Sequence, residues 1–581
     1  MKVKLFLFFL LISVTSWAQN PSYSVNAQKM SQLLKFINDN YLDTVNFEPL
    51  VDKGVVEVLK ELDPHSVFIP KKEVQQANEP LQGSFDGIGV TFQIIKDTIN
   101  IMEVIVNGPS EKVGLMVGDK IVKVDTAIAC GKHVNNKWVA DHLRGPKGTK
   151  VTVFVKRGKF AELLEFNIIR DKIPMYSINV SFMADKNTGY ICLERFAQTS
   201  TQELRDAMTR LKARGMKNLI LDLRGNGGGY LQAAFEIANE FIGDNKMIVY
   251  TDNFRKTGES FKASNKGEFL KGKLVVLVDE HSASASEIVS GAVQDWDRAL
   301  VIGRRTFGKG LVQKPIYLAD GSQVRLTISK YYTPSGRCIQ RPYEDGLDSY
   351  FDDLNKRYKH GEFLTADSIK FPDSLKYQTA KGRTVYGGGG IMPDIFIPLD
   401  TSLYSSLYNE MIRKGIISSF VLAYMETNKV AYQAKYATME DFKNRFEISE
   451  ALFQDLMNYA HKEGIKDSIP FQFSKRAELF VKNKAAELDS LYHSLEDLQK
   501  NTQYQKMLIE FVTESFNESM RLRNVNKAND FIKDALKYEI ARNLFSYGEA
   551  RQIFLMKDDY FLKALEVINN DKIFKRFNVE H

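Results

Sequence analysis

The segment KLVVLVDEHSASASEIVSGAVQDWDRALVIG, residues 273–303, carries a strand, a helix and a second strand in direct succession. Its two ends, residues 273–280 and 298–303, are short runs rich in Val, Leu and Ile, as in strands buried on both faces. Between them, residues 284–297 have the length and spacing of a helix. A strand–helix–strand unit of this kind predicts two parallel strands joined by a helical crossover.

The same alternation extends over residues 190–398 and predicts an α/β core around a mostly parallel sheet. The segments that carry it are the strands TGYICLERF (188–196) and NLILDLRG (218–225) and the helices STQELRDAMTRLKARG (200–215) and YLQAAFEIANEFIG (230–243). QVRLTISKYYT (323–333) predicts a later strand at the edge of this sheet. Residues 341–385 are polar and turn-rich and predict an inserted loop region, after which VYGGGGIMPDIFIP (385–398) returns to the core.

The flanking regions have different patterns. Apolar residues recur at helical spacing from Ser24 to about Lys60, and Asp63-Pro64 closes this region. Short β-branched runs separated by Gly and Asp turns then predict a small β-rich domain, with a short helix at residues 109–113. After Leu403 the pattern is nearly all helical. We therefore predict a multidomain α+β chain with boundaries at 1–18, 19–82, 83–170, 171–400 and 401–581.

The composition limits the function classes. The chain has 581 residues, 44% of them hydrophobic, and a net charge of +7 with basic and acidic residues interspersed. This does not favour nucleic-acid binding. Three cysteines, Cys130, Cys192 and Cys338, form no disulfide framework, although one pair remains open. Without CxxC or HExxH spacing, we expect no metal and no cofactor.

The first residues predict export. MKVKLFLFFLLISVTSWAQN has Lys2 and Lys4, an apolar run from Leu5 to Val14 and small residues at Ser16 and Ala18. This is typical of a secretory signal peptide cut after Ala18. The run is too short to span a bilayer, and we expect no span in the mature chain. The alternative is an uncleaved anchor. The expected location is the periplasm.

Three stretches could carry chemistry, each at the carboxyl end of a predicted strand, where sites form in open α/β sheets. DLRGNGGGY (222–230) could expose backbone amides for an oxyanion. Ser284 lies at a strand-to-helix turn, where a helix N-terminus favours developing negative charge. Lys309 lies between two glycines in GRRTFGKGLVQ (303–313) and could take a serine proton if its amine is neutral.

Structural interpretations compete with these roles. Ser284 and Glu287 fit a capping box, and a glycine-rich turn is usually structural. A histidine base is an alternative to Lys309, but His281 is too close to Ser284 in sequence for easy triad geometry. LDPHS, around His65, is interpreted as a turn at a helix end.

The combination of DLRGNGGG, SASASEI and TFGKGLVQ, in this order, resembles the C-terminal processing peptidases, the tail-specific serine proteases of family S41. The β-rich region resembles a PDZ domain in GIGV (87–90), GPSEKVGLMVGDKIVKVD (108–125) and RGPKGTKVTVFV (144–155). The resemblance covers roughly Gln28 to Pro398. It implies a PDZ β-barrel inserted before an α/β (ClpP/crotonase-like) serine protease core, between helical N-terminal and C-terminal regions.

The resemblance also implies roles for single residues. Ser284 would be the nucleophile, Lys309 its base, and Gln313 the residue that orients the base. The oxyanion amides would be those of Ala285 and Gly228. Asp295 stands where some members have a functional Asp, either catalytic or structural. Gly87, Ile88, Gly89 and Val90 would form the PDZ loop that receives a peptide's C-terminal carboxylate.

The expected function is a secreted serine endopeptidase that recognises free C-terminal tails of protein or peptide substrates. The main alternative is a catalytically silent PDZ scaffold, and a second is an esterase with the same acyl-enzyme chemistry. The C-terminal helices are compatible with a homo-oligomer, partner docking or a purely structural role. The substrate and any gating of the site by the PDZ domain stay open.

Overall fold

The computed structural model describes residues 21–158, 160–255, 257–400, 406–465 and 528–580. The predicted signal peptide, residues 1–18, lies outside these residues, as does much of the helical pattern between residues 470 and 548. Among the helices of the described residues, none is both long and apolar enough to cross a bilayer.

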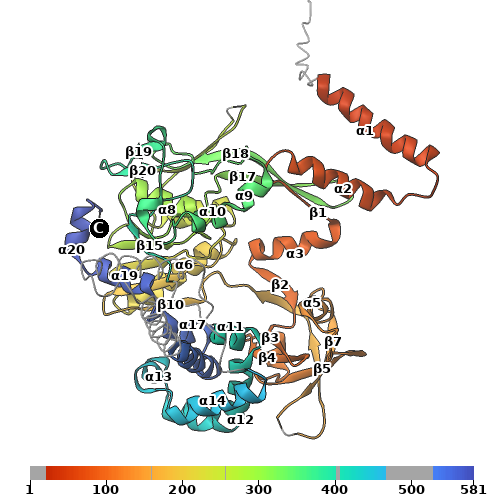
Figure 1. Cartoon of the computed structure of the whole chain (residues 1–581), viewed down its shortest axis with the longest axis vertical. Coiled ribbons are helices and arrows are strands. Elements are labelled where there is room, and N and C mark those ends of the chain that lie inside the picture. The colour runs from red at the N-terminus through yellow and green to blue at the C-terminus, as the bar shows by residue number, and fades with distance from the viewer. Residues whose placement is uncertain (1–20, 159, 256, 401–405, 466–527, 581) are drawn as a thin grey trace, which may run out of the picture.

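A six-stranded sheet forms the centre of the α/β core (Figure 1). Its strands, in spatial order, are β10 (Val180–Met183), β11 (Thr188–Cys192), β12 (Asn218–Asp222), β15 (Leu274–Val278), β16 (Leu300–Gly303) and β21 (Ile395–Phe396). The five strands from β11 to β21 are parallel, and only β10 runs antiparallel to its neighbour. The mostly parallel sheet predicted from the sequence is confirmed.

Three helices cover one face of this sheet. They are α6 (Ser200–Ala213), α7 (Leu231–Asn239) and α8 (Ala285–Asp295). Their apolar residues form one buried cluster with alternate residues of the strands, including Leu219, Leu221 and Val276. All eleven residues of α8 are buried, so the helix that begins beside Ser284 is held firmly within the core.

The opposite face of the sheet is covered by the end of the chain, α19 (Asp559–Ile568) and α20 (Asp571–Arg576). Phe561 lies against Phe182 and Tyr190, with ring centroids 6.0 and 5.4 Å apart. Figure 1 shows these two helices beside β15, far in sequence from the rest of the core. The region after residue 400 therefore supplies one whole layer of the α/β core. The hydrophobic pattern alone shows only that these segments are helical.

A second, antiparallel sheet lies beside the first. Its strands are β1 (Val67–Ile69), β18 (Gln323–Tyr332), β13 (Met247–Asp252) and β14 (Ser260–Lys262), with β17 (Leu311–Tyr317) also paired to β18. β18 was expected at the edge of the parallel sheet, and this was wrong. Burial along β18 is uneven, with several partly exposed residues, as is common in antiparallel sheets with one solvated face.

The β-rich region forms a separate domain. Its main sheet contains β3 (Val90–Ile95), β4 (Thr98–Val104), β5 (Lys120–Val124), β6 (Ala127–Ile128), β7 (Lys150–Lys156) and β8 (Leu164–Ile169). Two helices accompany it, α4 (Pro109–Lys112) and α5 (Asn136–Leu143). The ladder between β2 (Ser84–Gly87) and β9 (Asp171–Pro174) joins the entering and leaving chain.

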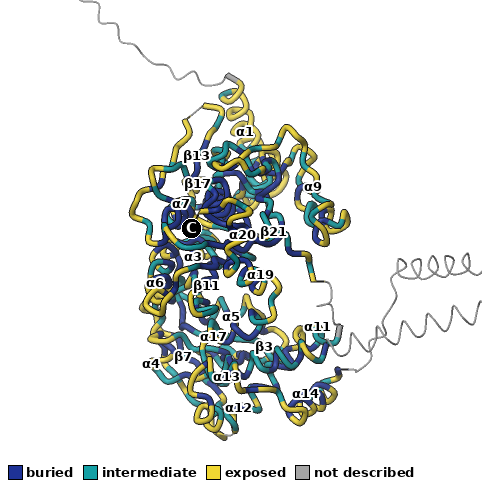
Figure 2. Tube along the Cα trace, turned by 90° about the vertical axis from the view of Figure 1, so that its left-hand side faces the viewer, coloured by how far each residue is buried: buried dark blue, intermediate teal, exposed yellow. Residues whose placement is uncertain are grey.

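Helices make up most of the remaining elements. The N-terminal region contains α1 (Pro21–Asn40), α2 (Phe47–Lys60) and α3 (Lys71–Gln82), and α1 is largely exposed (Figure 2). Residues 341–385 form α9 (Leu347–Phe351), α10 (Asp353–Lys359), two short 3₁₀ turns (Ala366–Ser368 and Asp373–Leu375), β19 (Lys376–Gln378) and part of β20 (Thr384–Tyr386). The C-terminal helices are α11 (Ser406–Arg413), α12 (Ile416–Lys435), α13 (Met439–Arg445), α14 (Glu450–Lys462), residues 528–544, α17 (Tyr547–Ala550) and α18 (Gln552–Leu555).

Candidate active site

Ser284 lies on a strained turn between β15 and α8. Its φ is 56° and its ψ −111°, a conformation that residues with a Cβ atom rarely adopt. The turn places Ser284 directly before the first residue of α8, Ala285, whose amide is among those that have no acceptor within the helix. A serine oxygen here lies beside the Ala285 amide at the positive end of a buried helix.

The glycine-rich loop after β12 reaches the same point. Gly228 has a φ of 101°, and a Cβ atom added there would lie 2.9 Å from the Ser284 Cβ and 3.0 Å from the Ala285 nitrogen. Only glycine fits at this distance. The Gly228 N–H donates to Asn226 Oδ1 at 2.9 Å. The loop therefore packs directly on the serine, with its Gly228 amide already paired.

Lys309 lies in the loop between β16 and β17, and its side chain is largely buried. Its Nζ donates to Gln313 Oε1 at 3.0 Å. Burial lowers the pKa of the Lys309 amine, and the positive charge of Arg325 lowers it further, whereas Glu287 and Asp63 act in the opposite direction. An amine whose pKa is lowered by burial is a candidate general base.

Glu287 connects the serine to the lysine. Its fully buried carboxylate accepts backbone N–H bonds from Ser284 (2.8 Å), Gly308 (2.7 Å) and Lys309 (2.9 Å), and the Thr306 hydroxyl bond (2.6 Å). Burial raises its pKa to about 7, against the lowering effect of these donors. The sequence suggested only a helix cap for Glu287. Its bonds to the Lys309 loop, 22 residues away, had no signal in the sequence.

Tyr331 makes a second connection between the same two residues. It is fully buried in β18, and its hydroxyl lies 2.6 Å from the Lys309 carbonyl oxygen and 3.1 Å from that of Ser284. The Glu287 carboxylate thus accepts from the backbone N–H groups of Ser284 and Lys309, and the Tyr331 hydroxyl lies within hydrogen-bond distance of their carbonyl oxygens. The two loops are fixed relative to each other by buried groups. Nothing in the sequence around Tyr331 distinguished it from an ordinary strand residue.

The LDPHS turn also belongs to this site, although the sequence suggested only a turn at a helix end. Gln313 Nε2 donates to the His65 carbonyl oxygen, and His65 Nε2 lies 2.7 Å from the Tyr350 hydroxyl. Burial lowers the pKa of His65 to about 4, and the charge of nearby Lys309 contributes. The turn is followed by β1, whose pairing with β18 carries it into the core.

Two other candidates, Asp295 and His281, have contacts of a different kind. Asp295 ends α8, ten residues beyond Ala285 and about 15 Å along the helix axis. It is buried, forms an ion pair with Arg337 at 2.8 Å and accepts from the Ser335 N–H. These contacts join the end of α8 to the segment that follows β18. His281 is exposed, and its Nε2 lies 3.9 Å from Glu280.

The four predicted loop residues of the β-rich domain are close together, as their sequence requires. Gly87 ends β2, Ile88 is buried, Gly89 has a φ of 76°, and Val90 begins β3. The Ile88 carbonyl accepts from the Ser110 backbone and hydroxyl, which fixes the loop against α4. A glycine at the positive φ lets the chain turn there without strain.

The end of the chain contacts the glycine-rich loop. Arg224 donates to both Asp558 carboxylate oxygens at 2.9 Å and also pairs with Asp222. Its guanidinium lies 4.5 Å from the ring centroid of Tyr560. Asp558 additionally caps α19 by accepting from the Phe561 N–H. The C-terminal helix is therefore tied to the loop that carries Gly228.

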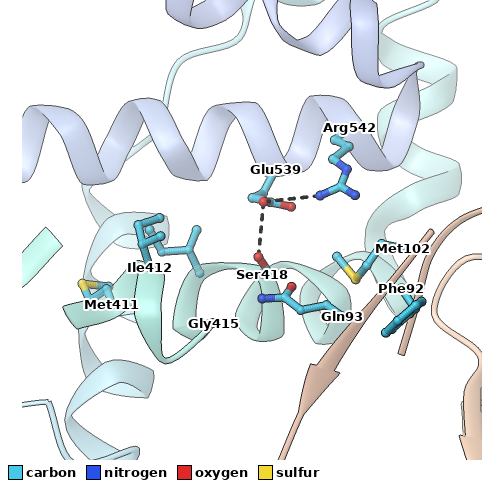
Figure 3. A pocket seen from close by; sticks show the side chains of 10 residues that line it. Phe92, Gln93, Met102, Met411, Ile412, Gly415, Ser418, Glu539 and Arg542 are labelled. Atoms are coloured by element: carbon cyan, nitrogen blue, oxygen red, sulfur yellow. Dashed lines mark hydrogen bonds and ion pairs between the residues drawn. The ribbon is translucent and has the colours of Figure 1, made fainter. Parts of the chain in front are cut away.

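A cavity of about 260 Å³ lies elsewhere, between the β-rich domain and the C-terminal helices (Figure 3). Phe92 and Met102 line it from the β-rich domain, and Met411 and Ile412 from α11. Glu539 and Ser418 also line it, and the Ser418 hydroxyl donates to Glu539 Oε1 at 3.2 Å. None of the residues that could act on a peptide bond lines this cavity.

Three family models match separate parts of this chain. Residues 187–347 match the model of peptidase family S41, residues 87–168 that of a PDZ domain, and residues 407–479 that of a family of unknown function (DUF8443). The carboxy-terminal processing protease CtpA of Bacillus subtilis (strain 168) is 33% identical over 357 residues, which are 60% of this chain and 75% of that protein.

Two further relatives are a curated protein and a solved structure. A probable CtpA-like serine protease of Staphylococcus epidermidis (strain ATCC 12228 / FDA PCI 1200) is 33% identical over 365 residues, 61% of this chain and 73% of that protein. The structure of a photosystem II D1 C-terminal processing protease is 24% identical, with a TM-score of 0.34, and the match covers 64% of this chain and 88% of that one.

A PDZ domain preceding an α/β core of the S41 type defines a serine peptidase. More narrowly, the chain belongs to the CtpA-like carboxy-terminal processing proteases of peptidase family S41. The expected fold class and enzyme class are confirmed.

Proposed function

We propose that this peptidase cleaves peptide bonds with a Ser284–Lys309 dyad. Lys309 accepts the hydroxyl proton as Ser284 attacks the scissile carbonyl. The tetrahedral intermediate collapses as protonated Lys309 donates to the leaving amine, which leaves an acyl-enzyme. Water then attacks the acyl carbon, with Lys309 again as base, and releases Ser284.

The observation that carries this proposal is the environment of the lysine. The Lys309 amine is buried, its pKa is lowered, and it is bonded to Gln313, while Glu287 and Tyr331 join its backbone to that of Ser284. A lysine in a solvated turn would be protonated at neutral pH and could not accept a proton. Gln313 would orient the amine.

The oxyanion would be stabilised by the amides of Ala285 and Gly228. The Ala285 N–H opens α8, and Gly228 lies against it. Because the Gly228 N–H donates to Asn226 Oδ1, the proposal requires the substrate oxygen to replace that acceptor. An oxyanion donor is typically worth about 10²–10³-fold in kcat. Asp295 would serve the fold, through Arg337.

We further propose that the PDZ domain receives the free carboxylate of a substrate tail at residues 87–90, and that the protein acts in the periplasm after export. Consecutive amides beside a glycine suit a carboxylate, and the tail would add a strand beside β3. The sequence of residues 1–18 supports export.

The test compares three proteins without residues 1–18: wild type, Ser284→Ala and Lys309→Ala. Each is incubated with an unstructured protein that ends in a free apolar carboxylate. We expect cleavage by wild type alone, since general-base catalysis contributes about 10²–10⁴-fold. Cleavage by Lys309→Ala at the wild-type rate would refute the dyad, and cleavage by Ser284→Ala would place the nucleophile elsewhere.

A matched pair of substrates tests the tail. The same protein with an amidated C-terminus should be cleaved with a higher KM, because the amide gives the loop no charge to bind. A small ester substrate has no tail, and its hydrolysis provides a control that the same enzyme preparation is equally active in the assays with the acid and with the amide. Equal KM values for acid and amide would contradict carboxylate recognition.

A further inference from the structure

The amide of Gln313 lies between two groups with opposite requirements. Its nitrogen donates to the His65 carbonyl, and its oxygen accepts from the Lys309 amine. A carbonyl oxygen can only accept, so the His65 carbonyl keeps the amide nitrogen on its side. The amide oxygen must then face Lys309. The orientation that Lys309 encounters is therefore decided by residue 65, which lies on the other side of the PDZ domain in sequence.

The turn that presents this carbonyl is fixed by one buried carboxylate. Asp63 accepts from the His65 N–H (2.8 Å), the Ser66 N–H (2.9 Å) and hydroxyl (2.6 Å), and the Thr327 hydroxyl (3.0 Å). The Thr327 N–H in turn donates to the Ser66 hydroxyl at 3.1 Å. These bonds tie the turn to β18 at a single residue.

Thr327 is also the residue that faces Gln313. In the ladder between β17 and β18, Gln313 is paired with Thr327, while β1 lies on the other side of β18. β18 therefore holds the turn and the glutamine in one register, and a shift of either would change the contact between them. A displacement of about 1 Å at a catalytic group can reduce turnover about 10²-fold.

The charges around Lys309 give the turn a second effect. The groups that act on its amine are Glu287, Arg325 and Asp63, and His65 lies close enough to be affected by it. Glu287 and Asp63 favour the protonated amine, and Arg325 favours the neutral one. Asp63 thus both shapes the turn and contributes to the field at the base.

We infer that Asp63, with the turn of residues 63–66, is a positioning element of the catalytic base: it fixes the Gln313 amide, and through it the Lys309 amine. This inference rests on the proposed Ser284–Lys309 dyad. The PDZ domain is accordingly inserted between two parts of one active site. The turn of residues 63–66 therefore belongs to the catalytic machinery.

The test measures kcat, KM and the pH profile of kcat with a small ester that needs no PDZ domain. Asp63→Asn should lower kcat about 10-fold or more, with KM within about twofold. It should also move the acidic limb of the profile to lower pH, because the charge that favours protonated Lys309 is gone. The loss of kcat at unchanged KM tests the positioning role, and the shift of the limb tests the charge of Asp63 at the base.

Two further variants guard against loss of the fold. Thr327→Val is nearly isosteric and removes only the hydroxyl bond to Asp63, so it should lower kcat at unchanged KM, and Thr327→Ser should restore it. The matched control is Asp185→Asn, because Asp185 fixes a similar turn by accepting from the Asn187 and Thr188 N–H groups. This turn precedes β11, whereas Lys309 follows β16, so the two lie at opposite ends of the parallel strands. Asp185→Asn should keep the wild-type kcat, and the acidic limb of its pH profile should not move.

The outcomes separate the two proposals. The positioning role would be overturned if Asp63→Asn and Thr327→Val both fold and both keep the wild-type kcat and pH profile. This holds even if Lys309→Ala is inactive. Full activity of Lys309→Ala would instead refute the dyad. If Asp63→Asn does not fold, the comparison of Thr327→Val with Thr327→Ser decides. Equal kcat values for these two variants would overturn the inference.

Discussion

Gln313 is an amide where a carboxylate would have nearly the same shape, and the difference lies in charge. In Gln313→Glu, a negative oxygen would face the Lys309 amine and a second would face the His65 carbonyl. An opposite charge at this distance favours the protonated amine and raises its pKa by about 1–3 units. We expect the acidic limb of the kcat profile to move to higher pH by that amount, with kcat reduced at pH 7.

The measurement is the pH–rate profile with a small ester, beside Gln433→Glu. Gln433 is an exposed residue of α12, so this control makes the same change of charge away from Lys309. An unmoved limb in Gln313→Glu would mean that Gln313 does not act on the protonation of Lys309.

His65 predicts a pH dependence of stability. An unfolded histidine binds a proton below about pH 6.5, whereas burial lowers the pKa of His65 to about 4. Between these values the unfolded state binds more protons, so acidification destabilises the fold, by up to about 3 kcal/mol. Relative to wild type, His65→Gln should therefore become more stable by about 2–3 kcal/mol between pH 7 and pH 4.5.

Urea unfolding at the two pH values measures this change. His281→Gln, which replaces an exposed histidine, should follow wild type. Because burial raises the pKa of Glu287 to about 7, that residue acts in the opposite direction in the same range, and only the difference between variants isolates His65. An equal change in the free energy of unfolding between the two pH values for wild type and His65→Gln would contradict the prediction.

The residues of the site differ in how visible they are in the sequence. Ser284 and Lys309 each follow a predicted strand within a short motif, so local sequence indicates them. Asp63, Glu287 and Tyr331 act through contacts that join segments 22 to 264 residues apart. Such contacts depend on how two sheets and a helix pack. A single sequence reports local propensity and periodicity, and it carries no record of these distances.

At the scale of the element, the strained turn before α8 has a measurable consequence. The φ of 56° and ψ of −111° at Ser284 suit glycine, whereas any side chain there is strained by about 1–3 kcal/mol. Ser284→Gly and Ser284→Ala should both be inactive. The Gly variant should nevertheless unfold at higher urea concentration, with a stability about 1 kcal/mol or more above that of the Ala variant.

The comparison of two inactive variants removes any effect of self-cleavage on the measurement. Lower stability of Ser284→Gly than of Ser284→Ala would show that the flexibility of glycine in the unfolded chain outweighs the strain. That outcome would contradict the predicted gain in stability.

The elements also show where periodicity succeeds and where it fails. The strands and helices of residues 188–303 follow from runs of Val, Leu and Ile with the right lengths. The sequence of a strand does not show which strand it pairs with. The composition of β18 would suit either sheet, and its position in the antiparallel sheet follows from its pairing with β1 and β13. For the same reason α19 and α20 are recognisable as helices, while their place on the protease core is not.

At the scale of the molecule, the protease core is closed by the last helices of the chain. One face of the parallel sheet is covered by α6, α7 and α8, which lie between its strands in sequence. The other face would expose Phe182, Tyr190, Val275 and Leu277 without α19 and α20. A parallel sheet needs both faces covered, because its strands are apolar on both sides. The helices α19 and α20 therefore complete the hydrophobic core of the sheet.

This arrangement predicts the effect of Phe561→Ala. Phe561 is 1% exposed and packs between Phe182 and Tyr190, so its truncation should lower the free energy of unfolding of the core by about 3–5 kcal/mol. Leu562→Ala, at the next position but 45% exposed, should change it by about 0.5 kcal/mol or less. Urea unfolding followed by ester hydrolysis reports on the core itself. If Phe561→Ala lost activity at the same urea concentration as wild type, the C-terminal helix would be an appendage, and the layer that it forms on the sheet would contribute nothing to the fold of the protease.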